Sequence, residues 1–480
     1  MKKIIITLLT FMLIGSSCLM ISPFSSKAYW DRDYAINVTI DGITYTAESG
    51  YAEDEEVPIE KEVYYVDRFE QSYDEQGNPL YTDIVIQDEI NGFPVVGIYT
   101  DDFNNHKEIT SVKLSKNMLF VQGFSGCTGL TEIQLPEKIE QVGGFNDCIG
   151  LTEIVLPKGV KKVGGFSRCI NLKEIILPPS VECVGQSAFQ GCTKIKKIVF
   201  PKSVNTIFHN AFEGCTSLEE IIFESTTPER ILIYEYAFYN TPLVNRAQAK
   251  GEALVLEGGF LLNGSGMKGN VELTGDNINS VASCAFYGNK NIREVKIKDV
   301  SYIGQSAFER SGIIKLIVDN TEYIGDRAFR EAKKIKKASL KKVNKIGRYM
   351  FKNCKKMKEC KISGIKTISE GTFDDCVKLK KVIMGKETKT IGAGCFYQCK
   401  SLEKLIIKSK KKIVWKTREV KYADKGDVIF YKCKKLKKIT LKSKKISSTI
   451  KKVKFPKGVK LDVPNGARAK YRKYVDCKVI

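Results

Sequence analysis

Apolar residues recur along most of this chain at a nearly constant spacing. Between Gly123 and Cys169 the sequence reads GFSGCTGLTEIQLPEKIEQVGGFNDCIGLTEIVLPKGVKKVGGFSRC, which states one pattern twice. The apolar positions of the first copy return 21 residues later in the second copy. A single unit of this size cannot bury its apolar edge alone, so we expect consecutive units to stack as the coils of a solenoid.

Within one unit, the pattern predicts a short strand followed by a corner. The unit reads Phe-x-x-Cys-x-x-Leu-x-x-Ile-x-Leu-Pro and continues with a Val/Ile-x-x-Ile/Val-Gly step. In LTEIVLP we expect Leu151, Ile154 and Leu156 to point inward, while Glu153 and Val155 face out. The closing proline ends the strand because it has no N–H to donate.

The Leu-x-x-Ile-x-Leu portion of the unit can be followed through most of the chain. Its copies begin at Ile109, Leu130, Leu151, Leu172, Ile195, Leu218, Ile292, Ile313, Ile335, Met357, Leu379, Leu402, Leu436 and Ile450. Within each run the spacing is 21 to 23 residues, except for the last two steps of 34 and 14. This core and period are typical of leucine-rich repeats. We therefore predict a β-rich leucine-rich-repeat solenoid with a small strand-rich cap at its N-terminal end.

Irregular stretches divide the chain into six segments. We expect a signal peptide over residues 1–28, an acidic N-terminal cap region over 29–83, and the first half of the array over 84–239. Coils that carry an insertion follow over 240–285, then a Lys-rich second half over 286–462 and a closing segment over 463–480. Alternation in AINVTIDGITYTAE and EVYYVDRF predicts strands that cover the open edge of the first coil. A partly disordered acidic tail is the alternative for residues 29–83.

The N-terminus has the features of a secretory signal. Lys2 and Lys3 precede an apolar run over Ile4–Ile21, and SSKA provides a small-residue cleavage site at Ala28. Cys18 leaves lipidation as an alternative. No other apolar run is long enough to span a bilayer, so we expect no transmembrane segment. The expected location is extracellular, either secreted or held non-covalently at the surface.

Charge is distributed unevenly along the chain, whose net charge is +23. Residues 29–105 carry a net charge of −16, residues 106–289 carry −1, and residues 290–480 carry +37. The acidic head, neutral middle and basic tail therefore present three different surfaces.

Nine of the fifteen cysteines stand three residues after a repeat Phe. They are Cys127, Cys148, Cys169, Cys192, Cys215, Cys354, Cys376, Cys399 and Cys433. A fixed place in the repeat favours a packing role, in which a buried thiol behaves as a small hydrophobic group. We expect these thiols to stay reduced, with disulfides as the alternative.

The repeats resemble those of the BspA-like leucine-rich-repeat proteins of bacterial and protist surfaces. QSAFQGCTKIKKIVFPKSVNTI and ISEGTFDDCVKLKKVIM are similar to that family's repeat, and IVIQDEINGFPVVGIYTDDF is similar to its opening coil. NTPLVNRAQAKGEALVLEGGFLLNG resembles an insertion found between its coils, and VPNGARAKYRKYV resembles its closing segment. The resemblance covers most of the chain from about residue 84 and implies adhesion to host proteins or to other cells.

Catalytic chemistry finds little support in the sequence. The two histidines, His106 and His209, are about a hundred residues apart and therefore several coils apart. No phosphate-cradling loop is present, and the cysteines outside the repeat position lack metal-ligand spacing. We therefore expect no enzyme activity, no cofactor and no metal site.

The outward positions of the strands change from acidic and neutral residues in the early copies to lysines in the later ones. Candidate ligand-binding residues are Lys336, Lys337, Lys358, Lys380, Lys381, Lys437, Lys438, Lys451 and Lys452. Stacking should bring most of them into one stripe, which favours diffuse anionic polymers over a shaped pocket. A Lys-rich surface that only improves solubility is the alternative.

A further outward position is often aliphatic. Val155, Ile176, Val199, Ile222, Ile317, Ile383 and Ile406 occupy it. Exposed aliphatics in a row suggest a partner surface, and insertion against a neighbouring coil is the alternative.

Two functions remain open from the sequence. The first is a secreted or surface-acting protein that binds a host or cell-surface protein, or an acidic glycan, on its strand face. The second is a structural protein held by lysines to anionic wall polymers. End-to-end self-association through the acidic head is a further possibility. Nucleic acid is not an expected partner, because the basic residues lack interleaved stacking aromatics.

Overall fold

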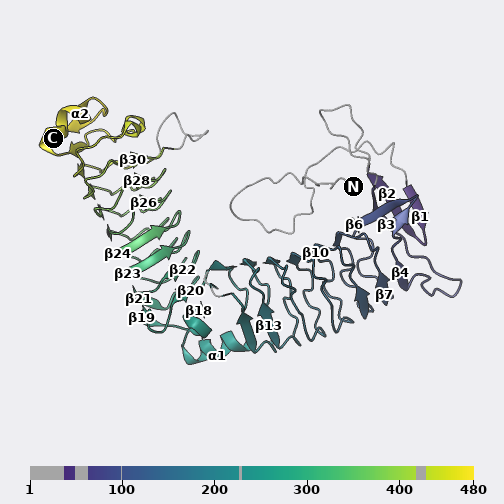
Figure 1. Cartoon of the computed structure of the whole chain (residues 1–480). Helices are drawn as coiled ribbons and strands as arrows, with labels where there is room; N and C mark the ends of the chain where they lie inside the picture. Colours follow the sequence, from purple (N-terminus) through teal and green to yellow (C-terminus); the bar gives the residue numbers. More distant parts are fainter. Residues whose placement is uncertain (1–36, 49–62, 99, 226, 228–229, 418–428) are drawn as a thin grey trace, which may run out of the picture.

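The computed structural model describes residues 37–48, 63–98, 100–225, 227, 230–417 and 429–480. The expected signal peptide lies outside the described residues. The chain forms a β-solenoid with few helices, and its coils stack in two successive runs that meet at an angle (Figure 1). The predicted solenoid and the strand-rich N-terminal region are both confirmed.

A five-stranded sheet forms the N-terminal end. Its order is β1 (Asn37–Ile40), β2 (Ile43–Glu48), β3 (Val63–Phe69), β6 (Phe93–Ile98) and β5 (Glu89–Ile90). Tyr45 and Tyr64 are fully buried in it. Leu119 donates its N–H to the carbonyl of Val96 at 2.9 Å, so the sheet continues directly into the first coils.

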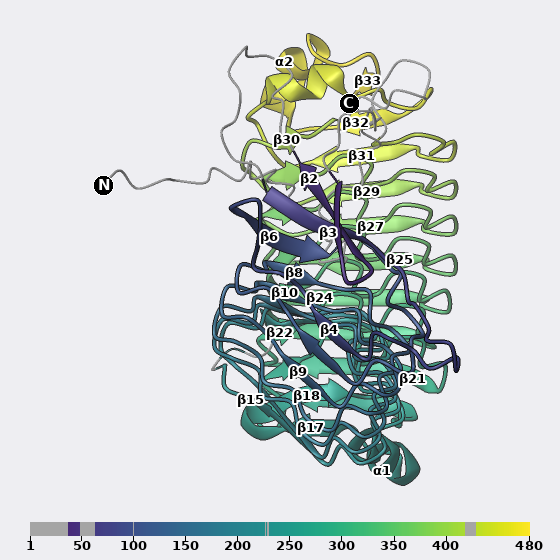
Figure 2. The same cartoon turned by 90° about the vertical axis from the view of Figure 1, so that its right-hand side faces the viewer.

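Each coil contributes to one or both of two parallel lines of strands. Line A holds the Leu-x-x-Ile-x-Leu segments: β4 (Asp83–Val85), β7 (Ser111–Lys113), β9 (Glu132–Gln134), β13 (Lys197–Phe200), β15 (Glu220–Phe223), β19 (Gly269–Thr274), β21 (Ile292–Lys298), β23 (Lys315–Ile324), β24 (Lys337–Ile346), β25 (Glu359–Ile362), β27 (Lys381–Met384), β29 (Lys404–Ile407), β31 (Lys438–Leu441), β32 (Lys460–Asp462) and β33 (Lys478–Val479). Figure 2 shows β25, β27, β29 and β31 stacked one above the next.

Line B holds the Val/Ile-x-x-Ile/Val-Gly steps. Its strands are β8 (Phe120–Val121), β10 (Gln141–Val142), β11 (Lys162–Val163), β12 (Cys183–Val184), β14 (Thr206–Ile207), β16 (Leu232–Ile233), β18 (Phe260–Asn263), β20 (Ser280–Val281), β22 (Tyr302–Ile303), β26 (Thr367–Ile368), β28 (Thr390–Ile391) and β30 (Val414–Trp415). The long strands β23 and β24 run through both lines. Gly144 and Gly165 turn the chain after line B with φ of 83° and 74°, as expected for the corner.

The predicted insertion separates the two runs of coils. It contains α1 (Pro242–Lys250), which begins with a proline and ends at Gly251 with φ of 73°, then β17 (Leu254–Leu256) and the short helix η3 (Glu257–Gly259). β17 pairs antiparallel with β18. We call the coils before the insertion the first arm (residues 83–239) and those after it the second arm (residues 260–480). Line A follows the outer side of the bend between the arms, and line B follows the inner side (Figure 1).

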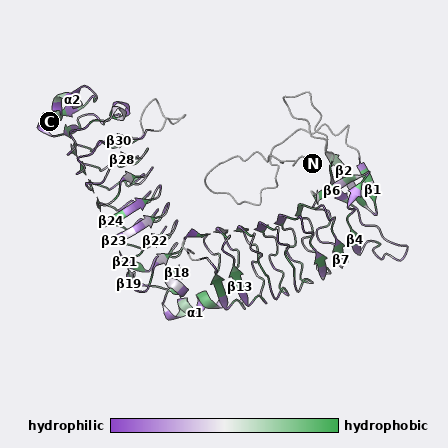
Figure 3. Cartoon of the chain, viewed as in Figure 1, coloured by the Kyte–Doolittle hydropathy of each residue, from purple (hydrophilic) through white to green (hydrophobic). Residues whose placement is uncertain are grey.

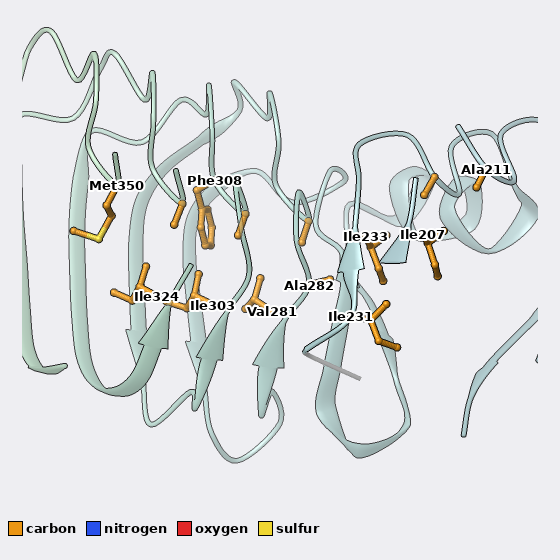
Figure 4. Packing of buried hydrophobic residues seen from close by; sticks show 14 of the residues in the cluster. Ile207, Ala211, Ile231, Ile233, Val281, Ala282, Ile303, Phe308, Ile324 and Met350 are labelled. Carbon is orange, nitrogen blue, oxygen red and sulfur yellow. The ribbon is translucent and has the colours of Figure 1, made fainter. Parts of the chain in front are cut away.

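The core is one continuous column of stacked side chains. Phe124, Phe145 and Phe166 stack with centroids 5.8 and 5.5 Å apart, and the second arm repeats this arrangement from Phe286 to Phe430. Figure 4 shows Ile233 of the first arm near Val281 of the second arm, so the apolar interior runs through the bend. Hydrophobic and hydrophilic residues alternate along the coils of both arms (Figure 3).

The inward assignment of LTEIVLP is confirmed, but its secondary structure is not the expected strand. Leu151, Ile154 and Leu156 are buried, and Val155 is 80% exposed. Residues 151–157 and 172–178 nevertheless form no β-bridge with their neighbours, so line A is interrupted between β9 and β13. The continuous strand ladder expected from the repeat therefore exists only in part of the molecule.

The C-terminal end departs from the predicted register. Ile450 does not begin a strand, because it lies in the short helix η4 (Ser448–Lys452), and the next strand of line A is β32. The closing segment contains η5 (Asn465–Ala467), α2 (Arg468–Arg472) and β33. Trp415 is buried in β30, within the step of 34 residues between Leu402 and Leu436.

Candidate binding surface

The strand register of the second arm brings lysines into one column on line A. We call this set the line A column. It consists of Glu294, Lys315, Lys337, Glu359, Lys381, Lys404, Lys438, Lys460 and Lys478, each aligned with the next. Neighbouring strands lie about 4.8 Å apart, so consecutive side chains of the column are close neighbours.

A second set of lysines flanks this column at the residue before it. Lys358 donates its N–H to the carbonyl of Lys336 at 2.8 Å, and Lys380 donates to Lys358 at 2.9 Å. Glu403 continues the set, and Lys437 donates to Glu403 at 3.0 Å. The structure therefore brings together Lys336, Lys337, Lys358, Lys380, Lys381, Lys437 and Lys438, as the sequence predicted.

Lys451 and Lys452 do not belong to this surface. Both lie on η4, which sits beside β30 of line B, where Thr449 accepts a hydrogen bond from the N–H of Trp415 at 2.9 Å. Their expected outward place on a strand was wrong, because the chain forms a short helix where the repeat pattern predicts a strand.

Few carboxylates compensate the charge of the column. Lys315 pairs with Glu294 at 2.8 Å, and Lys438 pairs with Asp462 at 2.8 Å. A hydrogen bond from Lys438 lowers the pKa of the Asp462 carboxyl. Among the described residues, no carboxylate lies within 4 Å of the ammonium groups of the other members or flanking lysines, namely Lys336, Lys337, Lys358, Lys380, Lys381, Lys404, Lys437, Lys460 and Lys478.

Sequence analysis missed four lysines of the column. They are Lys315, Lys404, Lys460 and Lys478. Most of the predicted copies carry two lysines in succession, which identify them in the sequence. Lys404 instead follows a glutamate in LEKLII. Aligning the single residue that precedes the middle aliphatic of each copy would have found Lys315 and Lys404. Lys460 and Lys478 lie after the last copy of the repeat that the sequence pattern places correctly.

Of the seven aliphatic residues predicted at this outward position, only Val155 and Ile176 are exposed. Val155 is 80% exposed and Ile176 is 70% exposed. The remaining members are half-buried beside their neighbours in register, as in the pairs Val199–Ile222 and Ile383–Ile406. The expected row of exposed aliphatic side chains is therefore wrong for most of the array. In those coils the aliphatic side chains pack against the neighbouring coil.

The nine repeat cysteines form a hydrogen-bonded ladder inside the core. Each thiol donates to the carbonyl of the repeat Phe in the preceding coil, from Cys127 to Phe103 at 3.0 Å through Cys433 to Phe396 at 3.0 Å. Burial raises the pKa of Cys127 to about 12. No disulfide joins any of the fourteen described cysteines in the structure, and that they stay reduced in solution remains a prediction.

The titratable groups outside the column form no metal site in the described part of the chain. His106 contacts Glu108 at 2.7 Å, and His209 contacts Glu235 at 3.3 Å, in separate coils. Across the described ranges, no group of three or more His, Cys, Asp or Glu side chains is arranged to hold a metal ion. No described helix combines the length and the apolar character needed to cross a bilayer.

Aromatic rings do accompany some lysines, contrary to expectation. Lys345 lies 5.2 Å from the ring centroid of Tyr323, and Lys432 lies 5.1 Å from that of Tyr431. None of these residues belongs to the line A column. That the protein has no nucleic-acid partner therefore stays a prediction. The lack of aromatic residues among the lysines no longer supports it.

Solved structures of other leucine-rich-repeat proteins are similar to this chain. A leucine-rich repeat protein from Bacteroides ovatus is 20% identical, with a TM-score of 0.36, and the match covers 92% of this chain and 99% of that one. A leucine rich cell surface protein from Faecalibacterium prausnitzii is 17% identical over 73% of this chain and 94% of its own, with a TM-score of 0.32. The pneumococcal vaccine antigen PcpA is 16% identical over 93% and 98%, with a TM-score of 0.34. No curated protein sequence matches the chain.

A family model settles which repeat this is. The model for the BspA type leucine rich repeat region, which describes six copies of the repeat, matches residues 96–164, 142–250, 269–364, 301–417 and 344–461. These ranges cover most of both arms, including most strands of line A and the cysteine ladder. The chain therefore belongs to the BspA type leucine-rich-repeat family.

Proposed function

We propose that this protein acts at the cell surface or after secretion, and that it binds a partner on line A of the second arm. The family is one of leucine-rich-repeat surface proteins, whose role in general is protein binding or adhesion. The partner that the surface suits best is an acidic glycan, or a host protein with an acidic face. The sequence-based expectation of adhesion is the broader form of this proposal.

The observation that carries the proposal is the uncompensated charge of the line A column. Like charges on neighbouring strands repel one another, and this repulsion costs stability unless an anion neutralises them. A linear polyanion could contact several lysines in succession, since the column extends from Lys315 to Lys478. Lysine is a flexible point charge and suits such a diffuse ligand better than a bidentate one.

A wall-associated structural role is the second candidate. The length of the column favours it, because a polymer lying along the whole second arm could hold the protein at the surface without a covalent link. The same lysines would carry both functions. They differ in whether the polymer belongs to the host or to the cell that makes the protein.

Binding to immobilised acidic and neutral polysaccharides and to matrix proteins, at two salt concentrations, tests the proposal. Dextran sulfate is a suitable acidic probe, and unmodified dextran is its neutral counterpart. Electrostatic binding should fall steeply between about 50 and 500 mM NaCl, because salt screens exposed charges. Replacing Lys380, Lys381, Lys437 and Lys438 by Glu should weaken dextran sulfate binding at least about tenfold, by losing and reversing charge on the column.

A matched control changes the same charge elsewhere on the second arm. Lys355, Lys356, Lys434 and Lys435 are exposed in turns between the repeat Cys and the following strand, outside the column. Their replacement by Glu should reduce binding far less than the column variant does. Equal losses in the two quadruple variants would show that only net charge matters. Unchanged binding in the column variant would mean that the lysines serve solubility alone.

A further inference from the structure

The first arm presents the opposite charge at the same place in its repeat. Asp83, Ser111 and Glu132 are aligned in register on β4, β7 and β9. Glu153 and Glu174 occupy the equivalent position of the next two coils. Glu132, Glu153 and Glu174 are exposed, and no described basic side chain forms an ion pair with them. Three acidic residues in successive coils are therefore left uncompensated.

Exposed aliphatic side chains accompany these glutamates. Val155 and Ile176 stand two residues after Glu153 and Glu174, and their exposed fractions of 80% and 70% are the largest among the exposed large hydrophobic residues. They lie where line A is interrupted, so no neighbouring strand covers them. We call Glu132, Glu153, Glu174, Val155 and Ile176 the first-arm patch.

We propose that the first-arm patch docks on line A of the second arm of another copy of this chain. The second arm carries the complementary arrangement, with Lys381 and Lys404 in the column and Ile383 and Ile406 two residues further on. Both surfaces thus have a charged position and an aliphatic position separated by two residues along the strand. At larger scale the charges do not oppose this contact, since residues 106–289 carry a net charge of −1 and residues 290–480 carry +37.

The repeat geometry sets the relative orientation of the two copies. If the facing strands run in the same direction and the stacks of coils run in opposite directions, glutamates face lysines and aliphatics face aliphatics. Burial of the four aliphatic side chains then adds to the charge pairing. The coils of both arms repeat with the same sequence unit, so the contacts can recur in successive coils.

Because of the bend between the arms, the contact joins the first arm of one copy to the second arm of another, which is a head-to-tail arrangement. Line A follows the outer side of the bend, so two copies can face each other with only one arm each (Figure 1). The patch and the column are different surfaces, and each docked copy keeps one of them free. Such heterologous contacts give chains or larger assemblies rather than a closed two-fold dimer.

The polymer of the proposed function and the second copy would compete for the same lysines. Self-association does not depend on that function, because it needs only the charge of the column. Conversely, the first-arm patch has no part in holding a polymer. The two proposals can therefore fail separately.

Sedimentation velocity of the full chain, over a range of protein and salt concentrations, tests self-association. We expect the average sedimentation coefficient to rise with protein concentration in moderate salt and to return to the monomer value in high salt. Replacing Glu132, Glu153 and Glu174 by Lys should abolish the rise, and so should replacing Lys381, Lys404 and Lys438 by Glu. An equimolar mixture of the two variants should recover it, since the reversed patch of the first variant can pair with the reversed column of the second, and the unchanged patch of the second with the unchanged column of the first.

Glu137, Glu182 and Glu257 are exposed residues outside line A, and the control variant replaces them by Lys. It should associate as the parent does, and the first-arm variant should still bind dextran sulfate at least as strongly as the parent. A parent chain that stays monomeric at every concentration overturns the proposal. Association that persists in the first-arm variant also overturns it, and would point to another acidic surface such as the N-terminal region.

Discussion

The two arms are built from the same repeat, yet they connect their coils in different ways. In the first arm, line B forms an unbroken six-stranded sheet from β8 to β16, while line A is split into β4–β7–β9 and β13–β15. In the second arm, line A runs without interruption from β19 to β33. The apolar pattern therefore determines how each coil folds, whereas other residues determine whether successive coils pair their strands in line A or in line B.

Proline at the end of the strand contributes to the difference by removing one donor, although β9 keeps its pairing with β7 ahead of Pro136. Pro157, Pro178 and Pro201 follow the last inward residue of line A at the three junctions between β9 and β13, and proline has no N–H to donate. In the second arm the same position holds residues that do donate. Ser363 bonds to the carbonyl of Leu340 at 2.9 Å, and Lys408 bonds to that of Met384 at 3.0 Å.

Truncation of a buried leucine should give the largest loss in the free energy of unfolding, and the loss should be the same in both arms. Leu151 and Leu379 are fully buried at the same repeat position, one in a coil without a line A strand and one in a coil with it. Truncating either to Ala removes core contacts and should lower the free energy of unfolding by about 2–5 kcal/mol. Chemical denaturation of each variant measures it. A shift in melting temperature below about one degree for Leu151→Ala would contradict its core position.

The next effect should distinguish the arms. Lys408→Pro removes a ladder hydrogen bond and should cost about 1–3 kcal/mol, because the carbonyl of Met384 loses its partner. Pro157→Ala removes no such bond and should change the free energy of unfolding by less than about 1 kcal/mol. Thermal unfolding of the two variants gives the comparison. Similar costs at the two sites would mean that the missing donor does not explain the interrupted ladder.

The smallest expected effect concerns pH and the cysteine ladder that both arms share. Burial raises the pKa of Cys127 in the first arm and of Cys433 in the second from 9.0 to about 12. Above pH 9 the unfolded chain loses these thiol protons while the folded chain keeps them, so stability should fall between pH 9 and pH 12. Each thiol contributes up to about 1.4 kcal/mol per pH unit in that range.

Single substitutions test this assignment. Cys127→Ala and Cys433→Ala should each make the loss of stability with rising pH less steep than in the parent, by a similar amount in the two arms. Denaturant midpoints measured from pH 8 to pH 11 provide the slopes. A parent whose stability is constant over this range would contradict the burial of the thiols.

The sequence predicted the coil well because one repeat constrains its own interior. Leu151 and Ile154 had to point inward for any stacking of the unit, and the repeat position of the cysteines indicated packing. The interruption of line A was not predicted, since it depends on hydrogen bonds between coils rather than on the pattern within one coil. Ile450 was misplaced because an apolar residue at the expected spacing fits a short helix as well as a strand.

The candidate surface was predicted in part for the same reason. Lys337, Lys381 and Lys438 share an outward position that the pattern identifies, and the strand register confirms their alignment. Lys460 and Lys478 could not be assigned, because β32 and β33 continue the stack of strands without the sequence pattern of the repeat. The first-arm patch depends on which aliphatic side chains stay uncovered, and the sequence pattern does not contain that information.

We propose that the line A column of the second arm is the surface that meets an anionic partner. Amine-reactive labelling followed by mass spectrometry, with and without dextran sulfate, tests it residue by residue. The account predicts strong protection of Lys337, Lys381 and Lys404, and little change at Lys355 and Lys434 in the turns of the same arm. Equal protection of column and turn lysines, or none at the column, would contradict it.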